Sequence, residues 1–431
     1  MQLFYQILEI VNYVAIGITS IGFLLQIVMI IFFFLKEKRF KEAQKQHKIG
    51  ILICAWNEEK VIGNTVRHLL SDLDYPKELY EVFVIADNCT DLTAEKAKEA
   101  GATVYIHHNP NHHNHGWALH DGVDLLLKER DDFDFFIFLD ADNHLEKHYL
   151  HKMNNAFESG VRIARPFEAS LNGNQNTWSA ISACYYVRDS RIASNFRERI
   201  HSDSMLCTPG MMVDAALLQE HGFDATSNSE DVEYTIKSLK RGEKVHYVAE
   251  AIVYEDQPTT SKDTWNRLIR MGNGIHKLFW TQGWGFLFDF FKHPRFSRID
   301  LFLQIMIIPV DVICFVWFPI YYIYYILLHL FNGFGPNPGF LGFIDAQGSY
   351  AILTSLALMI LVVVSFYFVI YIFQTGIAVI LSKKKLGVTN LKGYKRGIFL
   401  SPLFMIYYAF AIIFGIFTNA GWKQINRNDV K

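Results

Sequence analysis

The sequence predicts an α/β domain set between apolar helices that cross a membrane. The chain of 431 residues is 51% hydrophobic and only 19% charged, which is too apolar for an ordinary soluble enzyme. Its longest apolar runs lie near the two ends and are long enough to cross a bilayer. Between them, apolar runs of strand length alternate with helical patterns, as is typical of βαβ units.

The charge balance and the cysteines exclude some classes of protein. The formal net charge is only −2, so the chain is not a globally basic nucleic-acid-binding protein, and we expect no nucleic-acid partner. The five cysteines lie far apart, without a Cys-x-x-Cys pair. This spacing predicts free thiols in reduced surroundings rather than a disulfide framework.

The apolar runs predict four membrane spans, because about 20 apolar residues cross the hydrocarbon core. Residues 1–35 have neither a basic start nor a small-residue cleavage site, which favours a membrane anchor over a signal peptide. Residues 300–431 are predicted to hold about three helices. The four runs are Ile10 to Leu35, Leu301 to Leu330, Tyr350 to Leu381 and Ile398 to Thr418.

Basic residues predict the orientation, because Lys and Arg near span ends stay on the cytosolic side. Six of them lie in residues 36–48 and six in residues 383–396, whereas residues 332–349 contain none. We therefore expect a multi-pass protein of the cell membrane, with a cytosolic domain at residues 36–275. The side of the C-terminus stays open. Residues 276–299 mix aromatic and basic residues, which predicts a segment lying in the membrane interface.

The cytosolic region predicts a sheet with ligands at its carboxyl edge. Strands are expected near Ile49 to Ala55, Glu81 to Ala86, Ala102 to Ile106, Phe135 to Leu139 and Arg162 to Pro166. Helices are expected at Glu58 to Leu70, Thr93 to Ala100, Trp117 to Glu129 and Lys147 to Glu158. In an open parallel sheet, ligands bind outside the carboxyl ends of the strands. The acids that follow these strands should therefore converge on one crevice: Glu58, Asp87, Asp140 and Asp142.

The strongest single feature is an apolar strand that ends in two carboxylates, Phe136-Ile-Phe-Leu-Asp140-Ala-Asp142. Mg²⁺ and Mn²⁺ prefer oxygen ligands, and Mg²⁺ usually takes one or two carboxylates together with phosphate oxygens. The pair therefore outlines a site for a nucleotide diphosphate and its metal. An isolated Asp-x-Asp is more often a pair of strand-end acids that caps the next helix. The other motifs of the chain therefore have to distinguish a metal site from a helix cap.

Five motifs in order resemble the family 2 glycosyltransferases, inverting enzymes of GT-A fold that include cellulose, chitin and hyaluronan synthases. They are Ala55-Trp-Asn-Glu-Glu59, Asp74-Tyr-Pro76, Val84-Ile-Ala-Asp-Asn-Cys-Thr-Asp91, Asp140-Ala-Asp142 and Ser229-Glu-Asp231. The resemblance covers roughly residues 49–274. It implies a UDP-sugar donor, with Asp87 at the uracil. Asp140 and Asp142 would handle the diphosphate and its Mg²⁺ or Mn²⁺, and Asp231 would be the catalytic base.

The residue pattern supports a base at this position independently. Inversion needs one carboxylate to take the proton of the acceptor hydroxyl while a diphosphate leaves from the other face of the sugar. Asp231 stands at the start of a helical pattern, residues 232–240. The alternative is that Glu230 and Asp231 only interact with the helix dipole, a contribution under about 1 kcal/mol. The resemblance implies acceptor contacts for Glu230 and for Gly210, where glycine allows close approach.

Two motifs depart from the family pattern. Its Gln-x-x-Arg-Trp motif appears as Arg267-Leu-Ile-Arg270-Met271, so Arg270 keeps the cation expected at the diphosphate while the stacking tryptophan is absent. Trp265, more than one helical turn earlier, is assigned to the acceptor instead. The family's Lys-Gly pair reads His115-Gly116, and His115 is a candidate phosphate contact.

Three functions follow from these motifs. The favoured one is synthesis of a polysaccharide at the membrane from a UDP-sugar. A synthase that adds one sugar to a lipid acceptor is the alternative, because the tryptophan motif is degraded. A transporter whose GT-A-like domain senses nucleotide is more remote, since a sensor does not need a base.

Overall fold

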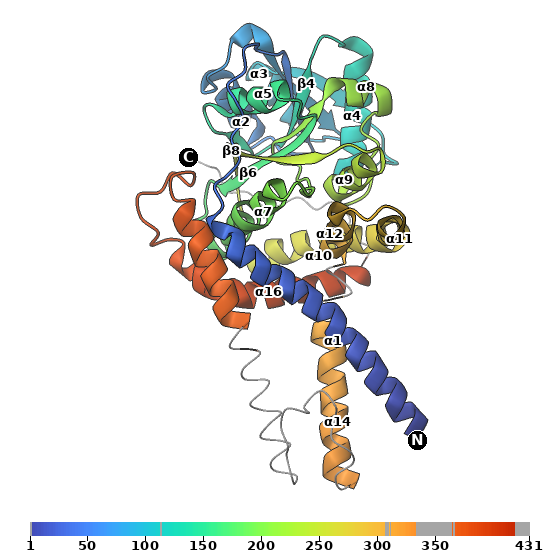
Figure 1. The fold of residues 1–431 in the computed structure, drawn as a ribbon. Coiled ribbons are helices and arrows are strands. Elements are labelled where there is room, and N and C mark those ends of the chain that lie inside the picture. Colours follow the sequence, from blue (N-terminus) through green and yellow to red (C-terminus); the bar gives the residue numbers. More distant parts are fainter. Residues whose placement is uncertain are drawn as a thin grey trace.

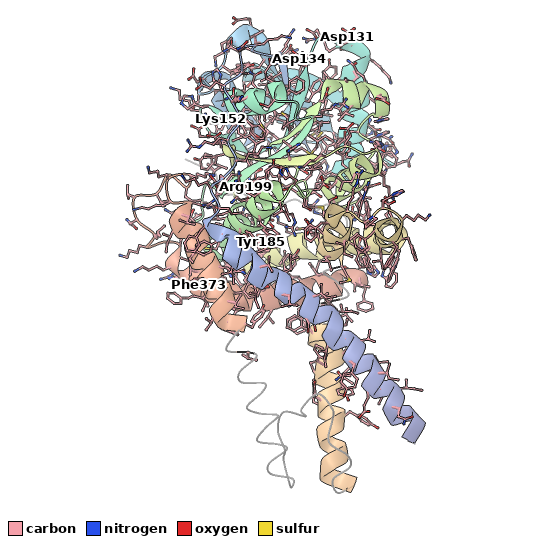
Figure 2. The ribbon with its side chains drawn as sticks, in the orientation of Figure 1. Asp131, Asp134, Lys152, Tyr185, Arg199 and Phe373 are labelled. Atoms are coloured by element: carbon pink, nitrogen blue, oxygen red, sulfur yellow. The ribbon has the colours of Figure 1, made fainter. Side chains whose placement is uncertain are left out.

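The α/β domain and the apolar helices form two regions of the molecule (Figure 1). The structure is a computed structural model that describes residues 2–112, 114–306, 310, 312–332, 364 and 367–418. In Figure 1, the helices α1 and α14 extend away from one side of the α/β domain. Figure 2 shows Asp131 at the opposite end of this domain and Tyr185 at its junction with the apolar helices.

Eight strands form one mixed sheet in the order β3-β2-β1-β4-β7-β6-β8-β5. Strands β1 to β4 pair in parallel, β7 runs antiparallel to both β4 and β6, and β8 is parallel to β6. The strands are β1 Ile49–Ala55, β2 Tyr80–Asp87, β3 Thr103–His107, β4 Phe135–Asp140, β5 His144–Leu145, β6 Ile163–Ser170, β7 Met211–Asp214 and β8 Val245–Glu255. The five predicted strands are confirmed, but the expectation of a parallel sheet is wrong for β5 and β7.

Helices cover both faces of this sheet. One face packs with α2 (Ile62–Ser71) and α5 (Tyr149–Glu158), and the other with α4 (His115–Glu129) and α8 (Ala215–His221). Strands buried on both faces are apolar nearly throughout, which explains why their sequences were recognisable. The remaining helices of the domain are η2 Lys77–Leu79, α3 Thr93–Glu99, α6 Thr177–Arg188, η3 Asp189–Ser194, α7 Asn195–Arg199 and α9 Glu230–Lys240.

The predicted helices are confirmed with small shifts at their starts. Helix α2 begins at Ile62 rather than at Glu58, because the backbone N–H of Glu58 donates to Thr93 Oγ1 at 2.8 Å in the loop after β1. Helix α4 begins two residues earlier than expected. The side chain of Asn114 accepts from the backbone N–H of Trp117 at 2.8 Å, which satisfies one of the unpaired donors at the start of the helix.

The C-terminal half consists of helices that lie against the domain and helices that leave it. Helix α10 packs closely on α16: a Cβ on Gly272 would lie 2.7 Å from Ile412 Cα, and one on Gly415 would lie 2.6 Å from Ile269 O. Glycine is therefore needed for the two backbones to approach. The helices of this half are α10 Ser261–Leu278, η4 Phe279–Gly283, α11 Trp284–Lys292, α12 Phe296–Ile305, η5 Ile313–Trp317, α14 Phe318–Asn332, Tyr367–Leu381 and α16 Lys395–Ile416.

Two of the four predicted spans correspond to single helices long and apolar enough to cross a membrane, Gln6–Phe34 and Lys395–Ile416. The first includes α1 (Gln2–Ile31) and η1 (Phe32–Phe34). The second is α16, nearly half of which is buried. In the predicted second span, α12 ends at Ile305, and η5 and α14 cover the apolar run from Ile313 to Asn332. In the predicted third span, residues 350–363 lie outside the described residues, as do residues 419–431 at the C-terminus.

The predicted interfacial segment, residues 276–299, includes η4 and α11. Phe279 and Phe286 are buried against α12, whereas Trp280, Phe288 and Phe291 are exposed, the last by 74%. Exposed aromatic rings beside basic residues suit a membrane interface, and the interfacial location of this segment stays a prediction.

The topology can be tested by cysteine labelling in intact cells. We expect a cysteine at Asp131 or Lys384, both exposed positions, to react with an impermeant maleimide only after the membrane is permeabilised, because both positions are predicted to be cytosolic. The parent protein, whose five native cysteines are free thiols, gives the background. Labelling of either position in intact cells would reverse the predicted orientation.

Candidate active site

The carboxyl ends of five strands meet at one edge of the sheet. Strands β1, β2 and β4 are parallel, and β6 and β8 share their direction because β7 runs antiparallel to both β4 and β6. Acidic residues lie at or near the ends of four of these strands. They are Asp87 on β2, Asp140 on β4, Glu168 on β6 and Glu255 on β8.

A cavity of about 1460 Å³ opens at this edge. Seven of the predicted site residues line it, brought together by the sheet, the loops that follow its strands and the helices α4, α9 and α10. They are Glu58, His115, Asp140, Asp142, Glu230, Asp231 and Arg270. The same cavity continues past α6 to apolar side chains of α1, η5, Tyr367–Leu381 and α16.

His115 joins two of the acids. Its Nδ1 lies 2.7 Å from Glu230 Oε1, and its Nε2 lies 3.3 Å from Asp140 Oδ1. Burial alone would lower the pKa of His115, but the charges of Glu230 and Asp140 outweigh it and raise the pKa. Glu230 also accepts from Thr208 Oγ1 at 2.9 Å. Although burial opposes it, the cationic form of His115 lowers the pKa of Glu230 to about 2.

The pKa of Asp231 shifts in the opposite direction to the pKa of Glu230. It lies in the first turn of α9, where its Oδ1 accepts from the backbone N–H of Val232 at 2.8 Å. Burial and then the negative charge of Glu230 raise the pKa of Asp231 to about 7. Two adjacent carboxyl groups thus have widely separated pKa values. Such a separation is characteristic of sites in which one acid stays ionised while the other exchanges a proton.

Asp140 and Asp142 lie in a tight turn at the end of β4. The backbone N–H of Asp140 donates to Asn143 Oδ1 at 2.8 Å, and Asn143 Nδ2 donates to Asp142 Oδ1 at 3.2 Å. Among the described residues, no group of three or more acidic, histidine or cysteine side chains surrounds a metal position. Two carboxylates suit Mg²⁺ or Mn²⁺ when phosphate oxygens complete the shell.

Asp87 lies at the end of β2, which β1 separates from β4, and it is not among the residues that line the cavity. His107 Nδ1 lies 2.7 Å from its Oδ1, and Asn88 Nδ2 donates to both of its oxygens. Burial, followed by the charges of Asp87, Asp140 and Glu230, raises the pKa of Cys54 on β1. Cys54 is therefore close enough to Asp87, Asp140 and Glu230 for their charges to act on its thiol.

The structure does not bring Gly210 and Trp265 into the cavity lining. Gly210 has φ +76°, and an added Cβ would lie 2.6 Å from the Tyr149 hydroxyl oxygen. The close approach that requires glycine is therefore to the protein itself rather than to an acceptor. Trp265 packs between α10 and α16, with its ring centre 5.1 Å from that of Tyr407 and 5.7 Å from that of Phe414.

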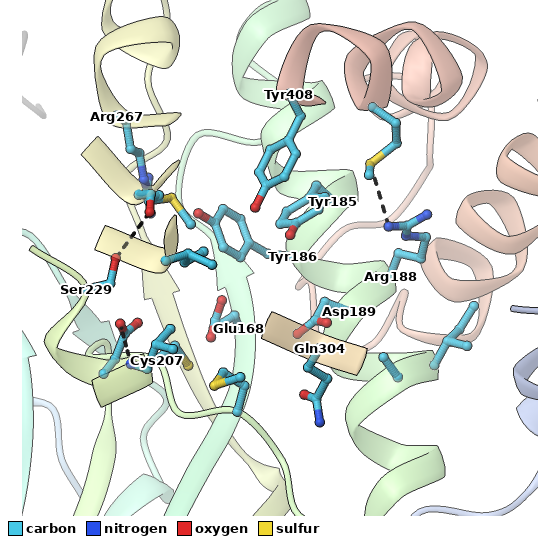
Figure 3. Close-up of a pocket in the computed structure, with 18 of the residues that line it drawn as sticks. Glu168, Tyr185, Tyr186, Arg188, Asp189, Cys207, Ser229, Arg267, Gln304 and Tyr408 are labelled. Atoms are coloured by element: carbon cyan, nitrogen blue, oxygen red, sulfur yellow. Dashed lines mark hydrogen bonds between the residues drawn. The ribbon is translucent and has the colours of Figure 1, made fainter. Parts of the chain in front are cut away.

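Sequence reasoning missed two buried ion pairs that line the cavity, and Figure 3 labels one member of each, Arg267 and Glu168. Arg267 Nη2 lies 2.6 Å from Glu255 Oε1, and Arg165 Nη2 lies 2.8 Å from Glu168 Oε1. Burial outweighs the attraction of Arg267 and raises the pKa of Glu255 to about 7. The signal for Glu255 was an acid at the end of an apolar run, the same signal that identified Asp140.

Residues 47–274, slightly more than half of the chain, match the family model described as "Glycosyltransferase like family 2". The chain belongs to this glycosyltransferase family. The resemblance seen in the five motifs is thereby confirmed for the family, and the domain is an α/β domain of GT-A fold.

Relatives within this family include a polysaccharide synthase. The chain is 23% identical over 318 residues to the poly-beta-1,6-N-acetyl-D-glucosamine synthase of Staphylococcus aureus, covering 70% of each protein. It is 26% identical over 284 residues to the probable glycosyltransferase YdaM of Bacillus subtilis, covering 61% of this chain and 63% of that protein.

A solved structure shares the fold over nearly the whole chain. It is the mannosyltransferase PcManGT from Pyrobaculum calidifontis in complex with GDP-Man and Mn²⁺. The TM-score is 0.55 at 13% sequence identity, and the match covers 94% of this chain and 98% of that chain.

The Asp-x-Asp turn provides a direct test of metal and donor binding. We expect Asp142→Asn to weaken both Mn²⁺ and UDP-sugar binding about 10-fold or more, because the change removes a charged oxygen ligand of a metal that the diphosphate shares, and even changes behind the ligands cost about 10- to 100-fold in metal affinity. Calorimetry of each ligand with and without the other measures this. Asp131→Asn, at an exposed aspartate of the same domain, is the matched control. Unchanged metal dependence in Asp142→Asn would refute this assignment.

Proposed function

We propose that the protein is an inverting glycosyltransferase that moves a sugar from a UDP-sugar to an acceptor presented at the membrane. The observation that carries this proposal is the placement of Asp231, with its raised pKa, in the same cavity as Asp140 and Asp142. A base and a diphosphate site on one cavity are the two components that inversion requires.

The donor side is assigned to the carboxyl edge of the sheet. Asp140 and Asp142 would hold Mg²⁺ or Mn²⁺ together with the diphosphate, and Arg270 would add positive charge at the leaving group. A bound divalent cation would neutralise the charge that develops on the departing diphosphate. Glu58 lines the same part of the cavity, and Asp87, one strand away, is assigned to the uracil. The complex of PcManGT with GDP-Man and Mn²⁺ supports this class of donor and metal.

The acceptor side is assigned to Asp231. As an acceptor oxygen forms its bond to the anomeric carbon, the bond from that carbon to the diphosphate oxygen breaks, and the hydroxyl proton passes to Asp231. Glu230 cannot easily replace it, because the pKa of about 2 makes Glu230 a weak proton acceptor near neutral pH. Its contacts to His115 and Thr208 assign Glu230 to organising the acceptor side.

The acceptor is proposed to be a growing polysaccharide, as the synthase from Staphylococcus aureus supports. A lipid acceptor is the second candidate, because the cavity extends from the acids to apolar side chains of α1, η5, Tyr367–Leu381 and α16. The helix pattern supports a cell-membrane location, with the catalytic domain in the cytosol. A transporter with a nucleotide-sensing domain is disfavoured, since sensing does not need a carboxyl group poised near neutral pH.

The role of Asp231 can be separated from donor binding. We expect Asp231→Asn to reduce kcat roughly 100-fold or more, the usual scale for general base catalysis, while UDP-sugar affinity stays close to normal. Transfer rates and calorimetry on the folded variant measure the two effects. Glu233→Gln is the matched control, because Glu233 lies in the same turn of α9 and accepts from the backbone N–H groups of Thr226 and Ser227. Transfer by Asp231→Asn at the wild-type rate would remove Asp231 from the mechanism.

The pH profile provides a second test of the same role. The base must be deprotonated to act, and its pKa is raised to about 7, so kcat/KM should increase as the pH rises through about 7. We expect this limb to disappear from the residual activity of Asp231→Asn. It should persist in Glu255→Gln, although the pKa of Glu255 is also about 7. Loss of the limb in Glu255→Gln alone would identify Glu255 as the base instead.

A further inference from the structure

The cavity has a second cationic position, away from the carboxyl edge of the sheet. Arg188 is the last residue of α6 and lines the cavity where α6 faces α16 and the helix Tyr367–Leu381. Figure 3 shows its side chain reaching toward α16. Its guanidinium carbon lies 4.7 Å from the ring centre of Tyr371, and its Nη2 lies 3.7 Å from the sulfur of Met405.

Three other arginines that line this cavity have carboxylate partners. Their pairs are Arg165 with Glu168, Arg197 with Asp300 and Arg267 with Glu255, at 2.6 to 2.9 Å. Arg188 has no ion pair within the part of the chain that the structure describes, and its enclosed Nη1 donates to no acceptor there. Asp189, its neighbour in the chain, pairs instead with Arg165 at 2.8 Å.

An enclosed cation without a counter-charge is unfavourable, because neither an aromatic ring nor a thioether replaces the water that it loses. The ring of Tyr371 and the sulfur of Met405 hold the guanidinium in place, but they do not neutralise it. A planar guanidinium fixed in this way presents its N–H donors in the geometry that matches phosphate or carboxylate oxygens. The counter-charge is therefore expected from a ligand.

The walls near Arg188 restrict the class of ligand. Apolar side chains from three helices line this part of the cavity: Leu25 of α1, Phe315 of η5, and Phe368 and Ile370 of Tyr367–Leu381. One of these helices, α1, is apolar and long enough to cross a membrane. A free anion would leave these apolar side chains exposed to water. An anion on an apolar chain would pair with the Arg188 guanidinium and also cover the apolar side chains.

We propose that this part of the cavity binds the anionic headgroup of an amphiphile, a phosphate-like group on an apolar chain, with Arg188 as its counter-charge. This rests on the proposed function, because the amphiphile is the lipid acceptor of the second candidate. Arg188 is a binding residue in this account. The hydroxyl that receives the sugar is separate from the anionic group and lies farther along the cavity, near Asp231.

The probe for this site is a photoreactive dodecyl phosphate, added to the full chain in nanodiscs of neutral phosphatidylcholine. We expect cross-links on α6, Tyr367–Leu381 and α16, and competition by plain dodecyl phosphate. Inorganic phosphate and neutral dodecyl maltoside should compete at least 10-fold less well. Equal competition by inorganic phosphate would identify a site for the free anion. Equal competition by the maltoside would show that the site does not distinguish a charged headgroup from a neutral one. Either result overturns the proposal.

Variants then separate the effect of Arg188 from that of any other positive charge on the protein. Arg188→Gln should weaken dodecyl phosphate binding roughly 10-fold, the effect expected from losing a charge-assisted hydrogen bond, whereas Arg188→Lys should retain most of it. Arg199→Gln, at an exposed arginine of α7, should have no effect. If Arg188→Gln does not fold, the cross-link map of the unaltered protein decides.

UDP-sugar binding is measured on the same samples and keeps the two proposals apart. Undiminished dodecyl phosphate binding by Arg188→Gln, with normal UDP-sugar binding, would overturn the amphiphile site and leave the proposed function intact. Failure of the unaltered protein to bind any UDP-sugar would refute the proposed function, whatever the amphiphile does.

Discussion

Negative charge gathered at one edge of the sheet is the constraint on which the rest of the site depends. Parallel strands place their carboxyl ends together, so the acids of β2, β4, β6 and β8 face a common region that burial makes poorly screened. The protein balances most of this charge with His115, Arg165 and Arg267. At Asp231, burial and then the negative charge of Glu230 raise the pKa to about 7. The charge balance therefore leaves two carboxyl groups of the cavity, those of Asp231 and Glu255, with pKa values of about 7. Glu255 is held by its ion pair with Arg267, which favours Asp231 for proton exchange.

The same edge is where the α/β domain meets the apolar helices. Helix α10 carries Arg267 and Arg270 to the cavity and is fixed to α16 by contacts that only glycine allows at Gly272 and Gly415. A helix with membrane-like composition thus helps to position cations of the polar site. This arrangement gives one continuous cavity that runs from the acids at the sheet to apolar side chains of the helices. Under the proposed function, the donor binds at the sheet end of this cavity.

The sequence predicted those features that depend on local pattern. The buried strands are apolar throughout, so the acids that follow them, Asp140 and Asp142, could be assigned to one edge. The contact between His115 and Glu230 could not be predicted, because these two residues are 115 residues apart in the chain and only the folded chain brings them together. The four-residue strand β7 is too short to show a period. Gly210 and Trp265 lie outside the cavity lining, and the sequence could not show this because a glycine or a tryptophan indicates close contact without indicating the partner.

The central claim is a single displacement in which Asp231 takes the acceptor proton while the diphosphate leaves from the opposite face of the sugar. The stereochemistry of the product tests it most directly. With a UDP-α-sugar labelled with ¹³C at the anomeric carbon, NMR of the first product reports the configuration of the new bond. The account predicts a β-linkage. An α-linked product would require a second displacement or a front-face reaction, and it would contradict the assignment of Asp231 as the base of an inverting enzyme.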